Sequence, residues 1–311
     1  MSSPVWPADL RVLERDWLSS NQLLCLGEAP AVIDTGHVKH AHDTLRLITD
    51  ALWPRTTLAA IAHTHLHSDH CGGTHALQTA WPAAQVCVPV STLPHVQAWN
   101  EDALTFGDTA QRCARFTAQH ALVPGRTVRL GARDWQIHAA PGHDALAVLL
   151  YQPDCGVLAA GDALWEHGVG VIFPHIDGEG GFEAFNDTLT LIEQLDPAWI
   201  VPGHGAPFAR ADGGIAAALA RARQRITSFI DHPAQHALYA AKVLIKYQML
   251  DAEQMTHAAF HAWAEATPTL HRLHQQHRPD LPWADWLALV LAPMLGKDVL
   301  RQTATHLVDG V

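Results

Sequence analysis

Imidazole and carboxylate side chains are concentrated in the segment Thr64-His65-Leu66-His67-Ser68-Asp69-His70-Cys71-Gly72-Gly73. Imidazole and carboxylate groups are the ligands that suit a divalent metal of intermediate softness. His65 and His67 are two apart, and residues at this spacing on an extended chain point the same way, so both imidazoles can reach one ion. Asp69 and His70 follow at once, and the turn that the two glycines permit would let them face a second ion. The segment therefore predicts a two-metal site.

The flanking sequence places this segment at the carboxyl end of a buried strand. Residues 58–62 are apolar and predict a strand, and a helix is expected after the segment, up to Trp81-Pro82. Another strand is expected over 85–88. Strand, polar loop, helix and strand form a βαβ unit, and α/β proteins commonly build their sites at the carboxyl ends of such strands.

The rest of the chain divides into a mixed region and a helical one. Apolar runs bounded by turn residues predict strands over 10–18, 22–26, 31–34, 127–130, 135–140, 146–151, 157–160 and 199–201. Helical spacing is seen over 45–52 and 182–192. Beyond residue 210 we expect helices over 215–229 and 233–250, and a third from Asp251, which forms a capping-box pattern with Gln254. We therefore expect one domain over residues 1–210 and a smaller all-helical domain over 211–311.

The run Thr64 to His70 resembles the signature THxHxDH of the metallo-β-lactamase superfamily. The other motifs of that family follow in the expected order. They are Asp34-Thr35-Gly36, Pro141-Gly142-His143, Ala160-Gly161-Asp162 and Pro202-Gly203-His204-Gly205. The resemblance covers about residues 10 to 210, and it implies an α/β fold, the αββα sandwich, with metals at one edge of two packed sheets.

The resemblance also implies which residues form the site. The expected metal ligands are His65, His67, Asp69, His70, His143, Asp162 and His204. His143 would join the first two histidines on one ion, His204 would join Asp69 and His70 on the other, and Asp162 would bridge them. Asp34 matches a carboxylate that orients the ligand loop. The expected cofactors are two divalent ions, zinc first, with iron or manganese as alternatives.

Other candidate residues have weaker support. The glycine-rich loop after Asp162 is a candidate wall of the substrate pocket, and its candidate residues are Trp165, His167, Phe173 and His175. For Trp165 and Phe173, filling of the core is an equally good interpretation. Five cysteines without paired spacing indicate free thiols, and Cys71 is expected to pack beside the site.

Composition narrows the class of protein and its partners. Of 311 residues, 48% are apolar and 16% charged, which is typical of a compact globular chain. No apolar stretch approaches the roughly 20 residues of a membrane span, and the charged N-terminal segment is unlike a signal peptide, so a cytoplasmic location is expected. A net charge of −11 without a basic tract disfavours nucleic acid. We expect a small-molecule substrate, and a homodimer is left open.

These residues predict a metal-dependent hydrolase. Two neighbouring ions lower the pKa of a shared water towards about 7, which provides a bridging hydroxide as nucleophile. Asp69 would hold this nucleophile and later carry its proton. In glyoxalase II relatives a threonine follows the Pro-Gly-His motif, whereas Asp144 follows it here. This difference weakens a glutathione thioester, and the expected substrate is a small ester, thioester or lactone.

Three alternatives remain at this stage. A nuclease or phosphodiesterase of the same superfamily would share every ligand, although no basic tract supports it. A persulfide dioxygenase would use one iron held by His65, His143 and Asp162. A non-catalytic metal-binding scaffold fits poorly, because no expected ligand is missing from the chain.

Overall fold

The computed structural model describes residues 5–54, 57–177 and 180–310, without the side chains of residues 175, 177 and 212. The chain divides into two compact units. The first comprises Met1–Leu104 with Arg112–Arg225, and the second comprises Thr105–Gln111 with Ile226–Val311. This division falls inside helix α8 (Gly214–Asp231). The sequence-based boundary after residue 210 lies before that helix and stays a prediction.

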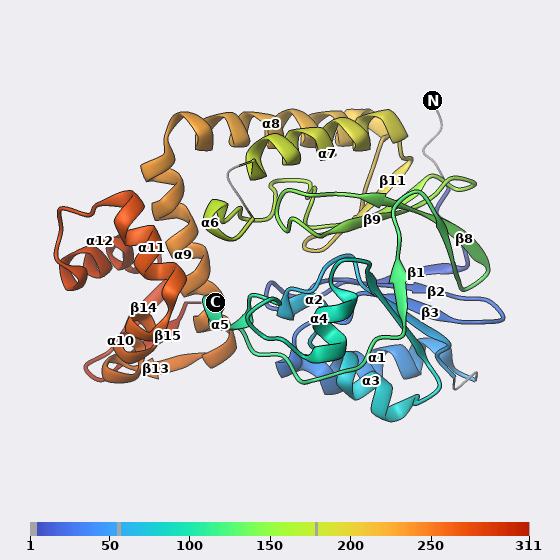
Figure 1. The fold of residues 1–311 in the computed structure, drawn as a ribbon, viewed down its shortest axis with the longest axis horizontal. Coiled ribbons are helices and arrows are strands. Elements are labelled where there is room, and N and C mark those ends of the chain that lie inside the picture. The colour runs from blue at the N-terminus through green and yellow to red at the C-terminus, as the bar shows by residue number, and fades with distance from the viewer. Residues whose placement is uncertain (1–4, 55–56, 178–179, 311) are drawn as a thin grey trace. The chain divides into compact units, whose positions relative to one another are not determined.

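Six strands of the first unit form one mixed sheet, in the order in which they occur in the chain (Figure 1). They are β1 (Leu10–Leu13), β2 (Gln22–Cys25), β3 (Ala31–Ile33), β4 (Ala60–Ala62), β5 (Gln85–Pro89) and β6 (His120–Leu122). The pairs from β1 to β3 are antiparallel, and those from β3 to β6 are parallel. Parallel pairing of β3 with β4 brings Asp34 beside the histidine segment, because both follow the carboxyl ends of these strands.

Six further strands form a second mixed sheet. They are β7 (Thr127–Leu130), β8 (Arg133–Ala139), β9 (Val148–Gln152), β10 (Val157–Gly161), β11 (Trp199–Pro202) and β12 (Phe208–Ala209). The order is β12-β11-β10-β9-β8-β7, and β10 and β11 are the parallel pair among antiparallel neighbours. The carboxyl ends of β10 and β11 therefore lie at one edge, where Asp162 and His204 follow.

One apolar core lies between the two sheets. Leu23 and Ile33 of the first sheet and Trp135 and Leu150 of the second belong to it, and each is at most 2% exposed. Side chains alternate between the two faces of a strand, so each sheet also has an outer face that needs a cover. Helices supply that cover.

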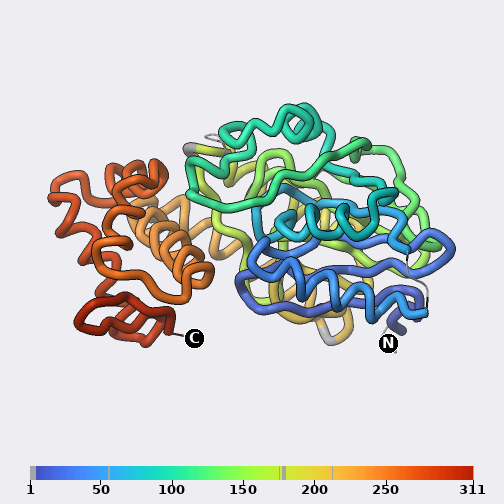
Figure 2. The backbone as a smooth tube through the Cα atoms, turned by 90° about the horizontal axis from the view of Figure 1, so that it is seen from below, coloured from blue at the N-terminus to red at the C-terminus, as the bar shows by residue number. Residues whose placement is uncertain are grey.

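Helices flank both sheets (Figure 1). On the first sheet lie α1 (Ala41–Leu52), α3 (Thr74–Ala80) and the short η1 (Val38–His40), α2 (Ser68–Cys71) and α4 (Leu93–Ala98). Over the second sheet lie α7 (Gly181–Leu195) and the part of α8 that belongs to the first unit, while α6 (Pro174–Asp177) and η2 (Ala211–Gly213) are short turns. Figure 2 views this unit from the side of α1 and α3. The predicted αββα sandwich is confirmed.

The predicted first strand was too long. Only Leu10–Leu13 pairs with a neighbour, and the chain then leaves the sheet before β2 begins. Arg15 donates its backbone N–H to Oδ1 of Asn21 at 2.9 Å, so a side chain takes the place of a strand partner. The apolar run up to Leu18 gave no sign of this bond.

The second unit is helical but not wholly so, which corrects the all-helical expectation. Its helices are α5 (Phe106–Thr109), the end of α8, α9 (Pro233–Ala252), α10 (His257–Ala266), α11 (Pro268–His277) and α12 (Trp283–Leu295). A three-stranded sheet of β13 (Gln254–Thr256), β15 (His306–Asp309) and β14 (Leu300–Gln302) accompanies them. Strands of three or four residues are too short to show a period of two.

The start of the third predicted helix was also misplaced. Asp251 belongs to the end of α9 and Gln254 opens β13, so they form no capping box. The hydroxyl of Thr256 instead accepts the backbone N–H of Ala259 and caps α10. A strand between the two helices displaced the start.

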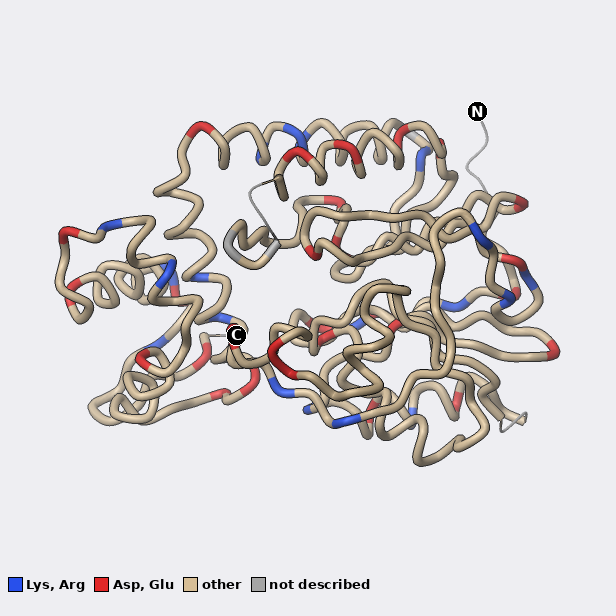
Figure 3. The backbone as a smooth tube through the Cα atoms, viewed as in Figure 1, with Lys and Arg blue, Asp and Glu red and all other residues tan. Residues whose placement is uncertain are grey.

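Two further observations concern the helices and the charged residues of the described part of the chain. None of the helices in the described ranges combines the length and the apolar character that crossing a bilayer requires. Figure 3 shows Lys and Arg positions spread among Asp and Glu positions along the described backbone.

Candidate metal centre

The seven predicted ligands lie in the loops, or in the short helix α2, that follow the carboxyl ends of strands. They are His65 and His67 after β4, Asp69 and His70 in α2, His143 after β8, Asp162 directly after β10 and His204 after β11. All are buried except His67, which is half-buried. The structure brings them together as two groups, each with ligand atoms within 4.8 Å of one another.

The first group, here called the imidazole cluster, consists of His65, His67 and His143. Nε2 of His65 lies 3.1 Å from Nδ1 of His67, which lies 2.8 Å from Nε2 of His143. Two imidazole nitrogens on one tetrahedral zinc are about 3.4 Å apart, given zinc–nitrogen bonds of about 2.0–2.1 Å. These two distances are somewhat shorter than that spacing, and all three nitrogens lie within 4.8 Å of one another, so the cluster fits a single ion.

The second group, here called the mixed cluster, consists of Asp69, His70, Asp162 and His204. Nε2 of His204 lies 3.0 Å from Oδ2 of Asp69. Nε2 of His70 lies 3.2 Å from Oδ1 of Asp162, yet among the described residues this buried nitrogen has no hydrogen-bond partner. A buried nitrogen left without a hydrogen bond is costly unless something else binds it. The donor set and this orphaned atom both fit a metal ion.

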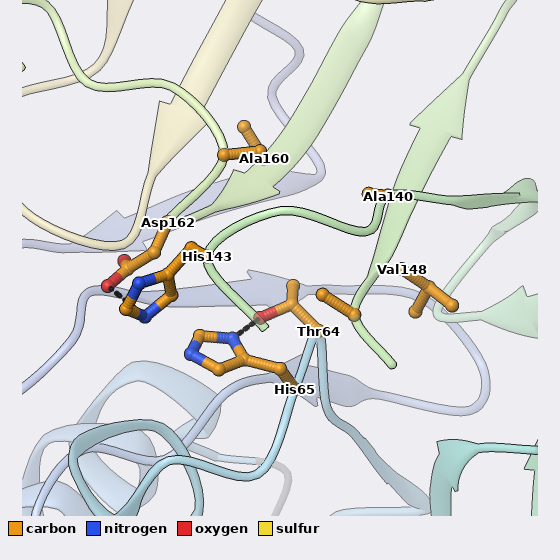
Figure 4. A pocket seen from close by; sticks show the side chains of 9 residues that line it. Thr64, His65, Ala140, His143, Val148, Ala160 and Asp162 are labelled. Carbon is orange, nitrogen blue, oxygen red and sulfur yellow. Dashed lines mark hydrogen bonds and ion pairs between the residues drawn. The ribbon is translucent and has the colours of Figure 1, made fainter. Parts of the chain in front are cut away.

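Asp162 faces both clusters. Its Oδ2 lies 3.4 Å from Nε2 of His143, and its Oδ1 lies 3.2 Å from Nε2 of His70 and 3.9 Å from Nε2 of His204. Figure 4 shows its carboxylate directed at His143. One carboxylate therefore offers an oxygen to each side, which is the arrangement that a bridging ligand needs.

The mixed cluster lies in a strongly negative electrostatic environment. Burial alone would lower the pKa of His70, but three surrounding carboxylates raise it well above the usual range. Burial likewise opposes ionisation of Asp69, but the His70 and His204 imidazoles lower the pKa of this carboxyl to about 2. Charged carboxylates around one imidazole stabilise added positive charge, so this site favours a cation.

The imidazole cluster has the opposite tendency. Burial and the neighbouring His67 lower the pKa of His143 to about 4. Burial and nearby imidazoles also hold the pKa of His65 well below its usual range. Neutral imidazole is the form that binds metal, so these histidines are set in the ligating state.

Asp34 lies behind the ligands and is 3% exposed. Its Oδ2 lies 2.8 Å from Nδ1 of His70, and it accepts both the backbone N–H and the hydroxyl of Thr64, at 2.9 and 2.8 Å. The Thr64 hydroxyl in turn lies 3.1 Å from Nδ1 of His65. Asp34 thus orients one ligand of the mixed cluster directly and one of the imidazole cluster through Thr64.

A backbone carbonyl orients the third imidazole. Nδ1 of His143 donates to the carbonyl oxygen of Val171 at 2.5 Å. The chain can approach so closely because the preceding residue is Gly170, where an added Cβ would lie 2.4 Å from Cγ of His143. The sequence indicated a glycine-rich loop here, but it gave no sign that this loop fixes a ligand.

The turn that carries His204 also depends on close approach. A Cβ at Gly203 would lie 2.1 Å from Oδ1 of Asp162 and 2.7 Å from Cε1 of His70. Only glycine leaves that space free. The Pro-Gly-His-Gly motif therefore serves the mixed cluster through its glycine as well as its histidine.

The weaker pocket predictions fall in different places. Trp165 is half-buried at the mixed cluster, where its Nε1 donates to Oδ1 of Asp162 at 3.2 Å. His167 is exposed, with Nε2 3.7 Å from a Glu166 carboxylate oxygen. Phe173 is buried at 8% exposure, and the side chain of His175 lies outside the described residues. As pocket residues, all four stay predictions.

Sequence reasoning missed the segment from Trp17 to Asn21. Ser20 donates its backbone N–H to the carbonyl of Asp69 at 2.9 Å, and Asn21 donates its own to the carbonyl of Gly203 at 2.7 Å. The amide of Asn21 also donates to the carbonyls of Pro202 and Gly205, at 3.0 and 2.7 Å. One short segment thus ties together the two loops of the mixed cluster.

A pocket borders three of the predicted ligands, and most of the other side chains that line it are small. The pocket beside Asp162 and His143 is lined further by Thr64, His65, Ala140, Ala147, Val148, Ala160 and Ala163 (Figure 4). Cys71 packs nearby without ligating geometry, because its Sγ donates to the Leu66 carbonyl and lies 3.6 Å from Sγ of Cys113. Burial raises the pKa of Cys71 well above its usual range, so it stays a thiol.

Known proteins resemble this chain in sequence. Residues 15–204 match the family model described as metallo-beta-lactamase superfamily. Hydroxyacylglutathione hydrolase of Legionella pneumophila (strain Lens) is 29% identical over 139 residues, which are 45% of this chain and 44% of that protein. The same enzyme of Rhodobacter capsulatus is 29% identical over 197 residues, 62% of this chain and 64% of that one. The chain thus spans between about half and two thirds of these relatives.

Solved structures with higher coverage share the fold. A metallo-beta-lactamase family protein of Thermus thermophilus covers 96% of this chain and 97% of its own, at 18% identity and a TM-score of 0.54. A metallo-beta-lactamase of Cronobacter sakazakii covers 76% and 95%, at 20% identity and a TM-score of 0.57. At such identities the likeness concerns the fold alone. The family model covers more than half of the chain, and the chain therefore belongs to the metallo-beta-lactamase superfamily.

Proposed function

We propose that this protein is a metal-dependent hydrolase with a two-metal site. The observation that carries the proposal is the carboxylate of Asp162, whose two oxygens face different clusters at 3.2 and 3.4 Å. A single-metal protein has no need of two complete ligand sets that share one carboxylate. Two divalent ions, when bound, polarise a substrate carbonyl and make hydroxide available near neutral pH.

The residues of the chain divide the remaining tasks. Asp69 has the most accessible of the three central carboxylates, at 11% side-chain exposure against 6% for Asp162 and 5% for Asp34. We assign Asp69 the role of orienting the attacking water and holding its proton until the leaving group accepts it. Asp162 and Asp34 lie deeper and act by keeping the ligands in place.

We propose zinc as the resident metal, with iron and manganese as the alternatives. Imidazole suits zinc, copper, iron and nickel, whereas carboxylate oxygen also suits manganese. On this basis the imidazole cluster suits zinc or iron better than manganese. The mixed cluster, with two carboxylates and two imidazoles, accepts a wider range of ions.

The proposed substrate is a small thioester, with ester and lactone as close alternatives. The curated relatives that match part of the chain are named hydroxyacylglutathione hydrolases, and a thioester is the bond that this name implies. The glutathione part does not carry over with it, since Asp144 follows His143 where the glyoxalase II motif named in the sequence analysis continues with threonine. A neutral acyl compound also suits a chain with a net charge of −11.

The test combines metal content with turnover. The purified protein is analysed for metals and assayed on a thioester, an aryl ester, a lactone and a phosphodiester, with Asp162→Ala as the inactive reference. We expect close to two ions per chain and turnover of the acyl compounds. One iron per chain with sulfite formed from a persulfide, or turnover of the phosphodiester alone, would replace the proposal.

A further inference from the structure

Trp17 is an exposed aromatic side chain at the metal centre. It is 62% exposed, although large apolar side chains are usually covered. Its ring stacks on that of His204, with centroids 5.5 Å apart and planes 12° apart. One face of the indole is thus fixed against a predicted ligand, while much of the ring stays open to solvent.

The position of Trp17 is set by the backbone around it. The segment that follows it is tied to the two ligand loops by the Ser20–Asp69 and Asn21–Gly203 backbone bonds, at 2.9 and 2.7 Å. An indole on such a segment does not need to be ordered when a ligand arrives. Preorganised aromatic surface of this kind binds apolar groups at little entropic cost.

Trp165 extends this aromatic surface. Its ring meets that of Trp17 edge-on, with centroids 5.5 Å apart and planes at 68°, and it meets that of His204 at 5.3 Å and 76°. Its one polar atom, Nε1, donates to Asp162. With that bond made, the rest of the half-buried ring offers only apolar contact.

We propose that Trp17 and Trp165 form a subsite for an apolar group of the substrate, either aryl or long alkyl, attached next to the bond that is cleaved. This inference rests on the proposed hydrolase function and narrows its substrate class. Indole surface next to a reacting centre selects apolar substituents by contact area and ring stacking. The group lies on either the acyl side or the thiol side of the thioester, and the test separates the two.

The test uses three thioesters of equal reactivity class. S-methyl thioacetate is the reference and carries no ring. The S-methyl thioester of phenylacetic acid carries a phenyl ring on the acyl side, and S-benzyl thioacetate carries it on the thiol side. The variants are Trp17→Ala and Trp17→Phe. Trp53→Ala is the matched control, because Trp53 is 75% exposed, follows the end of α1 and belongs to neither ligand cluster.

We expect Trp17→Ala to lower kcat/KM about tenfold for one of the two ring-bearing thioesters, mainly through KM. Turnover of the methyl reference should change less than about twofold. Trp17→Phe should recover most of the loss, and Trp53→Ala should behave as wild type. Metal content, measured in parallel, should be the same in all four proteins.

A binding measurement keeps the subsite separate from the reaction. Calorimetric titration with phenylacetate for the acyl side, benzyl alcohol for the thiol side and acetate as reference should show about tenfold weaker binding of one of the two ring-bearing compounds to Trp17→Ala, and no change for acetate. If no thioester is cleaved but this difference is found, the hydrolase proposal fails and the subsite stands. Equal losses on all three substrates, loss of metal, or no dependence on Trp17 in either assay would overturn the subsite.

Discussion

The two ligand clusters differ in the charge of the groups that surround and orient their ligands. Neutral groups orient the imidazole cluster, namely the Thr64 hydroxyl at His65 and the Val171 carbonyl at His143. The mixed cluster contains two carboxylates of its own, and a third, Asp34, binds His70 from behind at 2.8 Å. The fold therefore places most of its buried negative charge at one of two adjacent metal positions. The clusters should differ in metal preference and in their response to substitution.

The largest effect is expected where the clusters meet. Asp162→Ala removes the shared carboxylate, so metal content should fall to one ion per chain or less and kcat by at least about a thousandfold. Elemental analysis measures the metal content, and a turnover assay measures kcat. Asp187→Ala, an exposed position on α7, is the matched control and should keep both. Two retained ions in Asp162→Ala would show that the clusters are independent.

A smaller effect should separate the clusters from each other. His67→Ala and His204→Ala each remove one imidazole, from the imidazole cluster and the mixed cluster respectively. Each variant should keep about one ion, with kcat lowered about a hundredfold. Manganese titration followed by electron paramagnetic resonance should show binding in His67→Ala, whose mixed cluster is intact, and weaker binding in His204→Ala, whose mixed cluster has lost one ligand. Equal manganese affinity in both variants would contradict the charge difference.

The groups behind the ligands should matter less again. Asp34→Asn keeps the shape of the side chain but removes the charge at His70, and changes of this kind typically cost about 10–100-fold in metal affinity. The loss should concern the mixed cluster, since Asp34 reaches His65 only through Thr64. Competition with a chelator that strips the two ions in turn measures it. A greater loss at the imidazole cluster would reverse the assignment.

The smallest effect is expected at Asn21, which links the two loops of the mixed cluster. Asn21→Ala removes the amide that donates to the Pro202 and Gly205 carbonyls, while its backbone bond to Gly203 remains. The affinity of the mixed cluster for zinc should fall only several-fold, because the loss of a buried hydrogen bond costs about 1 kcal/mol. Zinc titration of Asn21→Ala beside Asn100→Ala, a position outside the metal centre, checks this. A loss as large as that of Asp34→Asn would give Asn21 a greater role than its contacts indicate.

Local sequence was sufficient for much of the fold and for the gathering of the seven side chains. His65 to His70 are close in the chain, whereas His143, Asp162 and His204 were expected at the site because the motifs around them resemble those of the superfamily, and each follows an apolar run that predicted a strand. The contacts of Asn21 could not be predicted in the same way. Its amide partner Pro202 lies 181 residues away, and the apolar pattern up to Leu18 favoured a longer strand. Trp17 was missed for the same reason.

The short strands of the second unit show another limit. β13 to β15 have three or four residues each, and their pairing joins segments on both sides of α10, α11 and α12. Such pairing is fixed by tertiary contact rather than by local preference. Helical spacing in the same region was long enough to be recognised.

Gly203 has a consequence for how substitutions in this chain should be interpreted. Its φ lies outside the left-handed range, so the backbone at this position would accept an alanine. The obstacle is steric, because an added methyl group would lie 2.1 Å from Oδ1 of Asp162 and 2.7 Å from Cε1 of His70, both of them predicted ligands. A mutational scan should therefore find position 203 tolerant when abundance is scored and intolerant when catalysis is scored. Few positions would separate those two selections so cleanly.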